Sequence, residues 1–341
     1  GFKEMNISVS EKPTGEITAG AGVGTSGATI GFGVRENNYL GSGVAVKTNF
    51  ELSEDSIKGM FSLNNPNYNN TDKSVYTTLE ATETNKLSDF GYKTNKTGFS
   101  FGTSFEYYDD FDFGLGVNTF FERIEADSSA SDRQKKQVGN YFDTFLNFNF
   151  DYDKRDQKFQ PSDGFKSYYS LNLPLVSDSQ TLVNSYTYSG YYEYFDKNVL
   201  KSSFFLKSSN SLTGKNVKLS ERNYIPSYKL RGFEYGKVGP KDGDDFIGAN
   251  IISTINFSST IPQILENSQS TDISVFLDIA NLWGVDYDSS LDNSNNIRSS
   301  IGIGLDWFSP IGPMNFSLSQ PLSKNSSDIT ETFRFNLGTT F

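Results

Sequence analysis

Few residues in this sequence could carry out catalysis. The chain contains neither histidine nor cysteine, which excludes Ser-His-Asp and Cys-His nucleophiles and thiolate metal sites. Asp151, Asp153 and Asp156 resemble paired carboxylates for glycoside hydrolysis, but they fall at the end of an expected strand and in the turn after it, where acidic residues are ordinary. The acidic run 241–245 lacks the spacing and the distal glutamate of a calcium loop. We therefore expect no enzyme activity, no metal and no cofactor.

A second pattern, the alternation of apolar and polar residues, runs through the whole chain. Near its end it places Phe333, Phe335, Leu337 and Phe341 on one face of a strand, with polar residues or glycine between them. Similar runs recur upstream, and several reach ~10 residues, the length of a tilted transmembrane strand. A final strand that ends in an aromatic residue is typical of a bacterial outer-membrane barrel.

The composition favours the same class of protein. The 341 residues include 30 Phe, 19 Tyr and 30 Gly, and no stretch approaches the ~18 consecutive apolar residues of a spanning helix. In a membrane barrel only alternate residues face lipid, and aromatic residues concentrate at the two interfaces. The net charge of −11 argues against a nucleic-acid partner.

The alternation predicts an all-β fold, a 16-stranded antiparallel transmembrane β-barrel, and single-chain bacterial barrels have an even number of strands. The expected strands cover residues 15–24, 28–35, 43–51, 56–63, 73–84, 92–107, 111–124, 139–152, 164–174, 183–195, 199–208, 248–258, 271–281, 297–307, 312–320 and 332–341. One connection, residues 209–247, shows little alternation over about forty residues. Structureless loops of this length are uncommon and are often functional.

The long connection carries a family motif. Leu230-Arg231-Gly232-Phe233, followed by Gly236 and Gly239-Pro240-Lys241, resembles the loop motif of the BamA family, whose barrels insert proteins into the bacterial outer membrane. Further blocks resemble that family in the same order: Pro13 to Gly43, Asp153 to Gly164, Phe276 to Asn281 (with Ala280 in place of the family's glycine), Trp307 to Leu322 and residues 333–341. The resemblance covers essentially the whole chain.

The resemblance implies that residues 13–341 form the barrel and that residues 1–12 are the remnant of the last periplasmic POTRA domain. It implies an outer-membrane insertase that works by lateral opening between the first and last strands. The implied partners are nascent outer-membrane β-barrel proteins, the lipid bilayer and accessory lipoproteins that bind mainly through the missing POTRA domains, with no nucleic acid. A TamA-like or two-partner-secretion translocator shares the architecture. A passive porin is a further alternative, and it requires an open lumen.

The resemblance also implies that the long loop folds into the lumen, where Arg231, with Gly232 and Phe233 beside it, meets Asp278. The sequence supports half of this pairing, because Asp278 lies opposite the apolar face of strand 271–281. The alternative without a functional role is that Arg231 is a solvated surface residue in a long loop. Where the family often has a second lumenal acid, this chain has Asn256, which leaves the network one charge poorer.

The second expected site is the seam where the barrel closes. The first strand is rich in glycine and small residues, and glycine weakens a strand through its entropy and lack of packing. An openable seam would expose backbone groups that can template an incoming strand, although glycine also tolerates tight lumenal packing. Cysteines at Ala19 and Asn336, or at near neighbours in register, are expected to lock the seam. The expected seam residues are Ile17, Ala19, Gly20, Ala21, Gly22, Phe335, Gly338 and Phe341.

Overall fold

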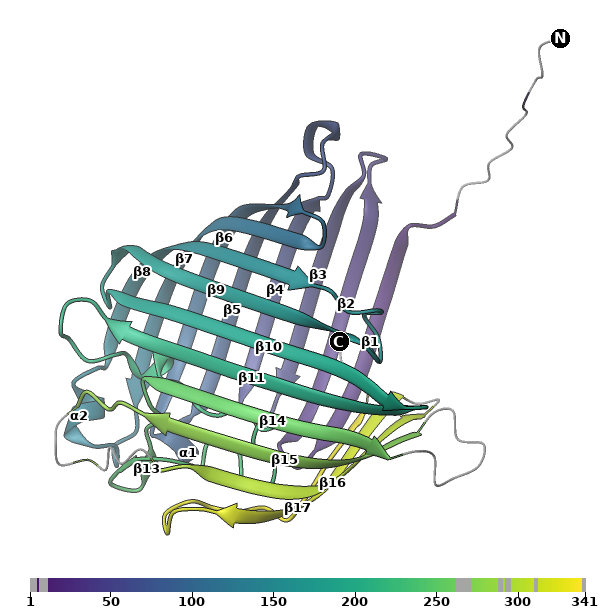
Figure 1. Cartoon of the computed structure of the whole chain (residues 1–341). Helices are drawn as coiled ribbons and strands as arrows, with labels where there is room; N and C mark the ends of the chain where they lie inside the picture. Colours follow the sequence, from purple (N-terminus) through teal and green to yellow (C-terminus); the bar gives the residue numbers. More distant parts are fainter. Residues whose placement is uncertain are drawn as a thin grey trace.

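The strands close into a single antiparallel barrel. The computed structural model describes Met5 and residues 12–261, 271–287, 291, 296–309 and 312–338. Sixteen strands follow one another around the wall in sequence order, and β18 pairs with β1 to close the cylinder (Figure 1). The expectation of a 16-stranded antiparallel barrel is confirmed.

The wall and its connections have the following bounds. The wall strands are β1 (Gly15–Gly24), β2 (Gly27–Tyr39), β3 (Val44–Ser53), β4 (Ser56–Asn65), β5 (Ser74–Lys86), β6 (Tyr92–Tyr108), β7 (Phe111–Ala126), β8 (Gly139–Asp153), β9 (Gly164–Ser177), β10 (Thr181–Phe195), β11 (Asn198–Ser211), β14 (Ile251–Ile261), β15 (Thr271–Trp283), β16 (Arg298–Ser309), β17 (Gly312–Ser323) and β18 (Phe333–Gly338). Short elements in the connections are η1 (Tyr68–Asn70), α1 (Leu87–Phe90), α2 (Asp132–Lys135), η2 (Leu219–Glu221), β12 (Lys241–Asp242) and β13 (Asp245–Phe246). No helix among the described residues is both long and apolar enough to cross a membrane.

Most expected strand boundaries differ from the observed ones by a few residues, and three of these differences are informative. The strand expected from residue 248 begins at Ile251, because Gly248 has a positive φ of 63° and Asn250 donates its backbone N–H to Gly284. Strand β2 continues to Tyr39 past a shift in register. The last strand is described over Phe333–Gly338, and the expected closing residue Phe341 lies outside the described residues.

The wall is apolar outside and polar inside. On β8, Phe142 is 46% exposed on the outer face, whereas its neighbour Asp143 is only 2% exposed on the inner face. Similar outward residues recur around the cylinder, for example Phe32, Leu79, Ile303 and Leu318, each more than half exposed. This arrangement is the reverse of that in a water-soluble protein, and it suits a wall with lipid outside and polar groups within.

The inner space is occupied by the connection between β11 and β14, residues 212–250, which we call the lumenal loop. It contributes Leu230, Phe233 and Val238 to one buried apolar cluster, which includes Ala280 and Leu282 of β15. A second cluster joins the loop to strands on the opposite part of the wall through Leu219 and Phe246, which pack with Phe90, Tyr92 and Ile124. The short elements α1, α2 and β13 gather at the same end of the barrel (Figure 1).

Candidate functional site

The tip of the lumenal loop is fixed to the wall by an ion pair. Nε of Arg231 donates to Oδ2 of Asp278 at 2.7 Å, Nη2 donates to Oδ1 at 2.8 Å, and the backbone N–H of Arg231 donates to Oδ2 at 3.1 Å. Asp278 is fully buried on the inner face of β15. A bidentate pair of this kind fixes the orientation of the loop as well as its distance from the wall.

Neighbouring residues complete the surroundings of this pair. Asn256 donates its side-chain amide both to Oδ1 of Asp278 at 2.8 Å and to the backbone carbonyl of Lys229 at 2.7 Å. Ser300 on β16 donates its hydroxyl to the carbonyl of Arg231. The Arg231 guanidinium lies 3.3 Å from the centre of the Phe276 ring. Asn256 therefore takes part in a three-residue cluster as a hydrogen-bond donor, although it adds no charge.

Gly232 allows the loop to approach the wall closely. Its φ of 89° is one that residues with a side chain rarely adopt, and a Cβ built there would lie 3.2 Å from the Cβ atoms of Ser300 and Ser319. The next residue, Phe233, is 1% exposed and packs in the apolar cluster of the loop. The motif residues thus divide their roles between charge pairing, backbone geometry and apolar packing.

A second anchor, which the sequence analysis missed, lies near the start of the loop. Nζ of Lys218 is 2.8 Å from Oε2 of Glu122 on β7, 2.6 Å from Oδ2 of Asp143 on β8, and 3.5 Å from Oε1 of Glu221. Burial alone would lower the pKa of Lys218, but the carboxylates of Glu221, Glu122 and Asp143 outweigh it and raise that pKa. Burial raises the pKa of Glu221, and the charge of Lys218 opposes the rise only in part. Nothing in the sequence around Lys218 indicates that it pairs with carboxylates as distant in the chain as Glu122 and Asp143.

The seam is short over the described residues. The register pairs Gly22 with Gly338, Val23 with Leu337, and Gly24 with Asn336. On its other side, β1 pairs with β2 over ten residues. Over the described residues, the first strand therefore has fewer partners in β18 than in β2.

Only some of the expected seam residues lie opposite a partner in the described part of β18. Gly22 lies opposite Gly338, and the carbonyl of Phe335 accepts a hydrogen bond from the backbone N–H of Thr25 at 3.1 Å. Nearer the start of β1, the described part of β18 places no partner opposite Ile17, Ala19, Gly20 or Ala21. Asn336 lies opposite Gly24 rather than Ala19, and the described part of β18 pairs with the end of β1.

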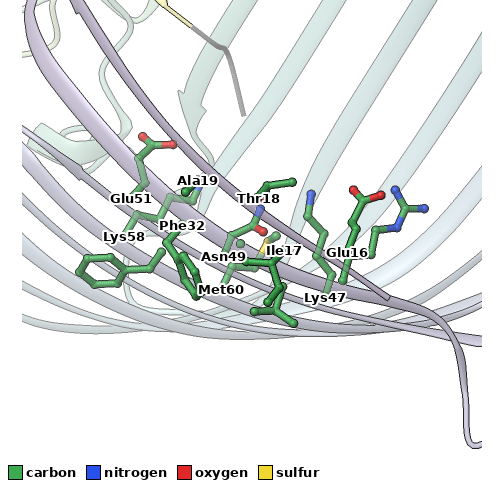
Figure 2. A pocket seen from close by; sticks show the side chains of 14 residues that line it. Glu16, Ile17, Thr18, Ala19, Phe32, Lys47, Asn49, Glu51, Lys58 and Met60 are labelled. Carbon is green, nitrogen blue, oxygen red and sulfur yellow. The ribbon is translucent and has the colours of Figure 1, made fainter. Parts of the chain in front are cut away.

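A cavity of about 580 Å³ lies beside the less-paired part of β1. Figure 2 shows Ile17 and Phe32 on one side of the strand ribbons and the charged side chains of Glu16, Lys47 and Glu51 on the other. The part of β1 that has no partner in the described part of β18 therefore has an apolar outer flank and a charged inner flank. Across the described stretches of chain, no group of three His, Cys, Asp or Glu residues is placed to hold a metal ion.

Comparison with known families identifies one match over most of the chain. The model of the Omp85 superfamily domain matches residues 38–341. Outer membrane protein assembly factor BamA of Neorickettsia risticii is 24% identical over 99% of this chain and 46% of its own length. The protein of the same name from Neisseria meningitidis is 23% identical, over 99% of this chain and 48% of its own length. The chain thus spans about half the length of the curated relatives it matches.

Solved structures share the architecture. The crystal structure of BamA from Haemophilus ducreyi lacking POTRA domains 1–3 superposes with a TM-score of 0.88 at 25% identity, covering 97% of this chain and 71% of that one. CdiB from Escherichia coli superposes with a TM-score of 0.63 at 13% identity, covering 98% of this chain and 64% of that one, which is a likeness of fold alone.

Proposed function

Because the chain belongs to the Omp85 superfamily, we propose that it is the barrel of an outer-membrane protein assembly factor, located in the bacterial outer membrane. The observation that carries the proposal is the unequal pairing of β1, which has ten register partners in β2 and three in the described part of β18. The substrates would be unfolded outer-membrane β-barrel proteins. The barrel would act through strand pairing by main-chain hydrogen bonds, and no covalent bond would be made or broken.

The edge of β1 that lacks a partner in the described part of β18 supports strand templating. A strand edge presents unpaired N–H and C=O groups, and an extended segment can add to it through main-chain hydrogen bonds. Separation of the short β1–β18 contact would extend this edge to the full length of β1. A substrate strand paired there would place its own apolar residues on the lipid side and its polar residues toward the lumen, in the register that β1 sets.

The rest of the chain fits this role better than the alternatives. The docked lumenal loop argues against a passive porin, because it occupies space that a conducting pore needs. The fold shared with CdiB keeps a secretion translocator as the second candidate. We further propose that residues 1–12 are the remnant of a POTRA domain, and that accessory lipoproteins act mainly through such domains.

Covalent closure of the seam tests the proposal. Val23 and Leu337 are register partners on the seam and both already carry a side chain, whereas a Cβ added at Gly24 would lie 2.7 Å from the carbonyl oxygen of Phe335. The variant with Val23→Cys and Leu337→Cys should form a disulfide, and the native chain has no cysteine to compete. In the full-length protein reconstituted in liposomes, oxidation should stop insertion of an unfolded barrel substrate, and reduction should restore it.

Controls separate seam closure from other effects of oxidation. Each single-cysteine variant should remain active, as should a disulfide between Ser62 and Thr78, register partners within the continuous β4–β5 ladder. Undiminished insertion by fully crosslinked protein would reject lateral opening. Passage of a soluble secreted substrate, without insertion of barrel substrates, would instead support the translocator.

A further inference from the structure

Arg334, the inward-facing charge of β18, binds the lumenal loop. Its Nη1 donates to the carbonyl of Ser227 at 2.6 Å and its Nη2 to the carbonyl of Phe233 at 2.7 Å. Its Nε and Nη2 also donate to Oε2 of Glu331 at 2.8 and 2.6 Å. The residue is 8% exposed, so its charge is buried and is balanced by one carboxylate and two backbone carbonyls. In the sequence, the residues of these two loop carbonyls, Ser227 and Phe233, lie before and after Arg231.

The segment that leads into β18 is tied to the same part of the loop. The backbone N–H of Glu331 donates to the carbonyl of Gly232, that of Glu234 donates to Ile329, and that of Ile329 donates to Lys237, at 3.0–3.1 Å. These bonds form a short antiparallel pairing between the loop and the β17–β18 connection.

A buried ion pair extends this attachment to the wall. Arg298 of β16 donates from Nε to Oδ2 of Asp328 at 3.0 Å, and Oδ1 of Asp328 accepts the backbone N–H of Gly239 at 3.1 Å. Arg298 and Asp328 are both at most 7% exposed. The loop therefore holds Arg334 of β18 and, through Asp328, Ile329 and Glu331, the segment that leads into that strand.

These contacts change what holds the last strand in place. In the described residues β18 pairs with β17 over five residues and with β1 over three. We propose that Arg334 is a positioning residue that couples β18 to the docked lumenal loop, so that release of the loop tip and separation of the seam are linked events. The consequence for insertion rests on the proposed function, whereas the coupling itself is a property of the barrel alone.

The contacts require arginine in particular. The planar guanidinium presents donors in a fixed fork and can reach two carbonyls and one carboxylate at once, whereas the ammonium of lysine is a compact point charge. Arg334→Gln should remove the charge and most of the fork, and Arg334→Lys should retain the charge but lose the simultaneous contacts. Arg123→Gln is the matched control, because Arg123 is an exposed arginine of β7 that pairs only with Glu125 among its described ion pairs.

Hydrogen exchange of the complete chain in lipid nanodiscs tests the coupling. Arg334→Gln should raise amide exchange about tenfold in both residues 228–237 and residues 333–338, with the β4–β9 wall unchanged. Arg334→Lys should give an intermediate rise, and Arg123→Gln should give none. If Arg334→Gln fails to fold, the same comparison is made with Arg334→Lys.

A second substitution distinguishes coupling from local damage. Asp278→Asn weakens the loop tip on the far side of Arg231, and it should raise exchange in residues 333–338 when Arg334 is present. In the Arg334→Gln background, or in the Arg334→Lys background if Arg334→Gln does not fold, this added effect should be lost or strongly reduced, because the link is already cut. Additive effects, or exchange that rises in β18 but not in the loop, would overturn the proposal. None of these readouts depends on insertion, so a failed insertion assay would leave the coupling standing.

Discussion

Asn256 lies directly opposite Asp278 on the neighbouring strand and donates its side-chain amide to that carboxylate at 2.8 Å. The two residues occupy the inner face of the wall where the tip of the lumenal loop docks. An uncharged donor thus supports a buried acid at a position where a second acid would have competed for the same arginine.

Asn256→Asp should destabilise the barrel by about 2 kcal/mol, because it removes both amide donations and sets like charges opposite each other on adjacent strands. Asn256→Ala is the matched control, since it removes the donor without adding charge and should cost about 1 kcal/mol. Urea unfolding in lipid, followed by the gel mobility of folded and unfolded forms, measures both. Equal losses for the two variants would show that the added charge has no effect.

Removal of the loop arginine should be more costly. Arg231→Ala leaves the fully buried carboxylate of Asp278 without its counter-charge, and loss of one partner of such a pair costs about 3–5 kcal/mol. Asp278→Ala should also destabilise the barrel, and the double variant should lose less than the sum of the two single changes. We further expect Arg231→Ala to impair substrate insertion. A double variant whose loss equals that sum would mean that the two side chains stabilise the barrel independently.

Gly232→Ala should destabilise the docked loop by about 1–2 kcal/mol, because the methyl group meets both the strained backbone and the wall serines. Gly214→Ala is the internal control: Gly214 lies in the same loop with a φ of 74°, but a Cβ there meets nothing within 4 Å. The difference between the two unfolding free energies measures the contact with the wall. Indistinguishable values would assign the whole cost to backbone strain.

Glu221→Gln should stabilise the protein at pH 8. Burial raises the pKa of Glu221 in the folded state, so that state favours the protonated acid. The advantage of the neutral form is complete below the unfolded pKa of about 4.3 and is lost as the pH rises through the folded value. Glutamine remains neutral, so the gain should vanish near pH 4. Glu234→Gln, which changes an exposed acid of the same loop, is the matched control for the substitution.

The wall was predictable from sequence and the interior was not. Strand alternation is a local signal, which is why the sixteen strands could be placed within a few residues of their observed bounds. The same alternation puts Arg334 on the inner face of the last strand but gives no sign that it binds Ser227, 107 positions earlier. Lys218 likewise meets Glu122 across 96 positions, and single charges in a loop have no period. The pair Arg231 and Asp278 was expected only through the family motif.

The register of the seam between β1 and β18 could not be predicted from the sequence, for a different reason. The glycine content of β1 indicated a weak strand, yet the register with β18 depends on where two remote segments meet, and a shift of a few residues leaves the alternation of each strand intact. For that reason the alternation could not show that Asn336 lies opposite Gly24 rather than Ala19.

The two anchors of the lumenal loop have their partners on opposite sides of the loop in the sequence. Lys218 donates to carboxylates on strands that precede it in the chain, whereas Arg231 pairs with Asp278, which lies 47 positions later. A barrel that stopped before β15 would therefore keep the partners of the first half of the plug and lose the wall on which the second half docks.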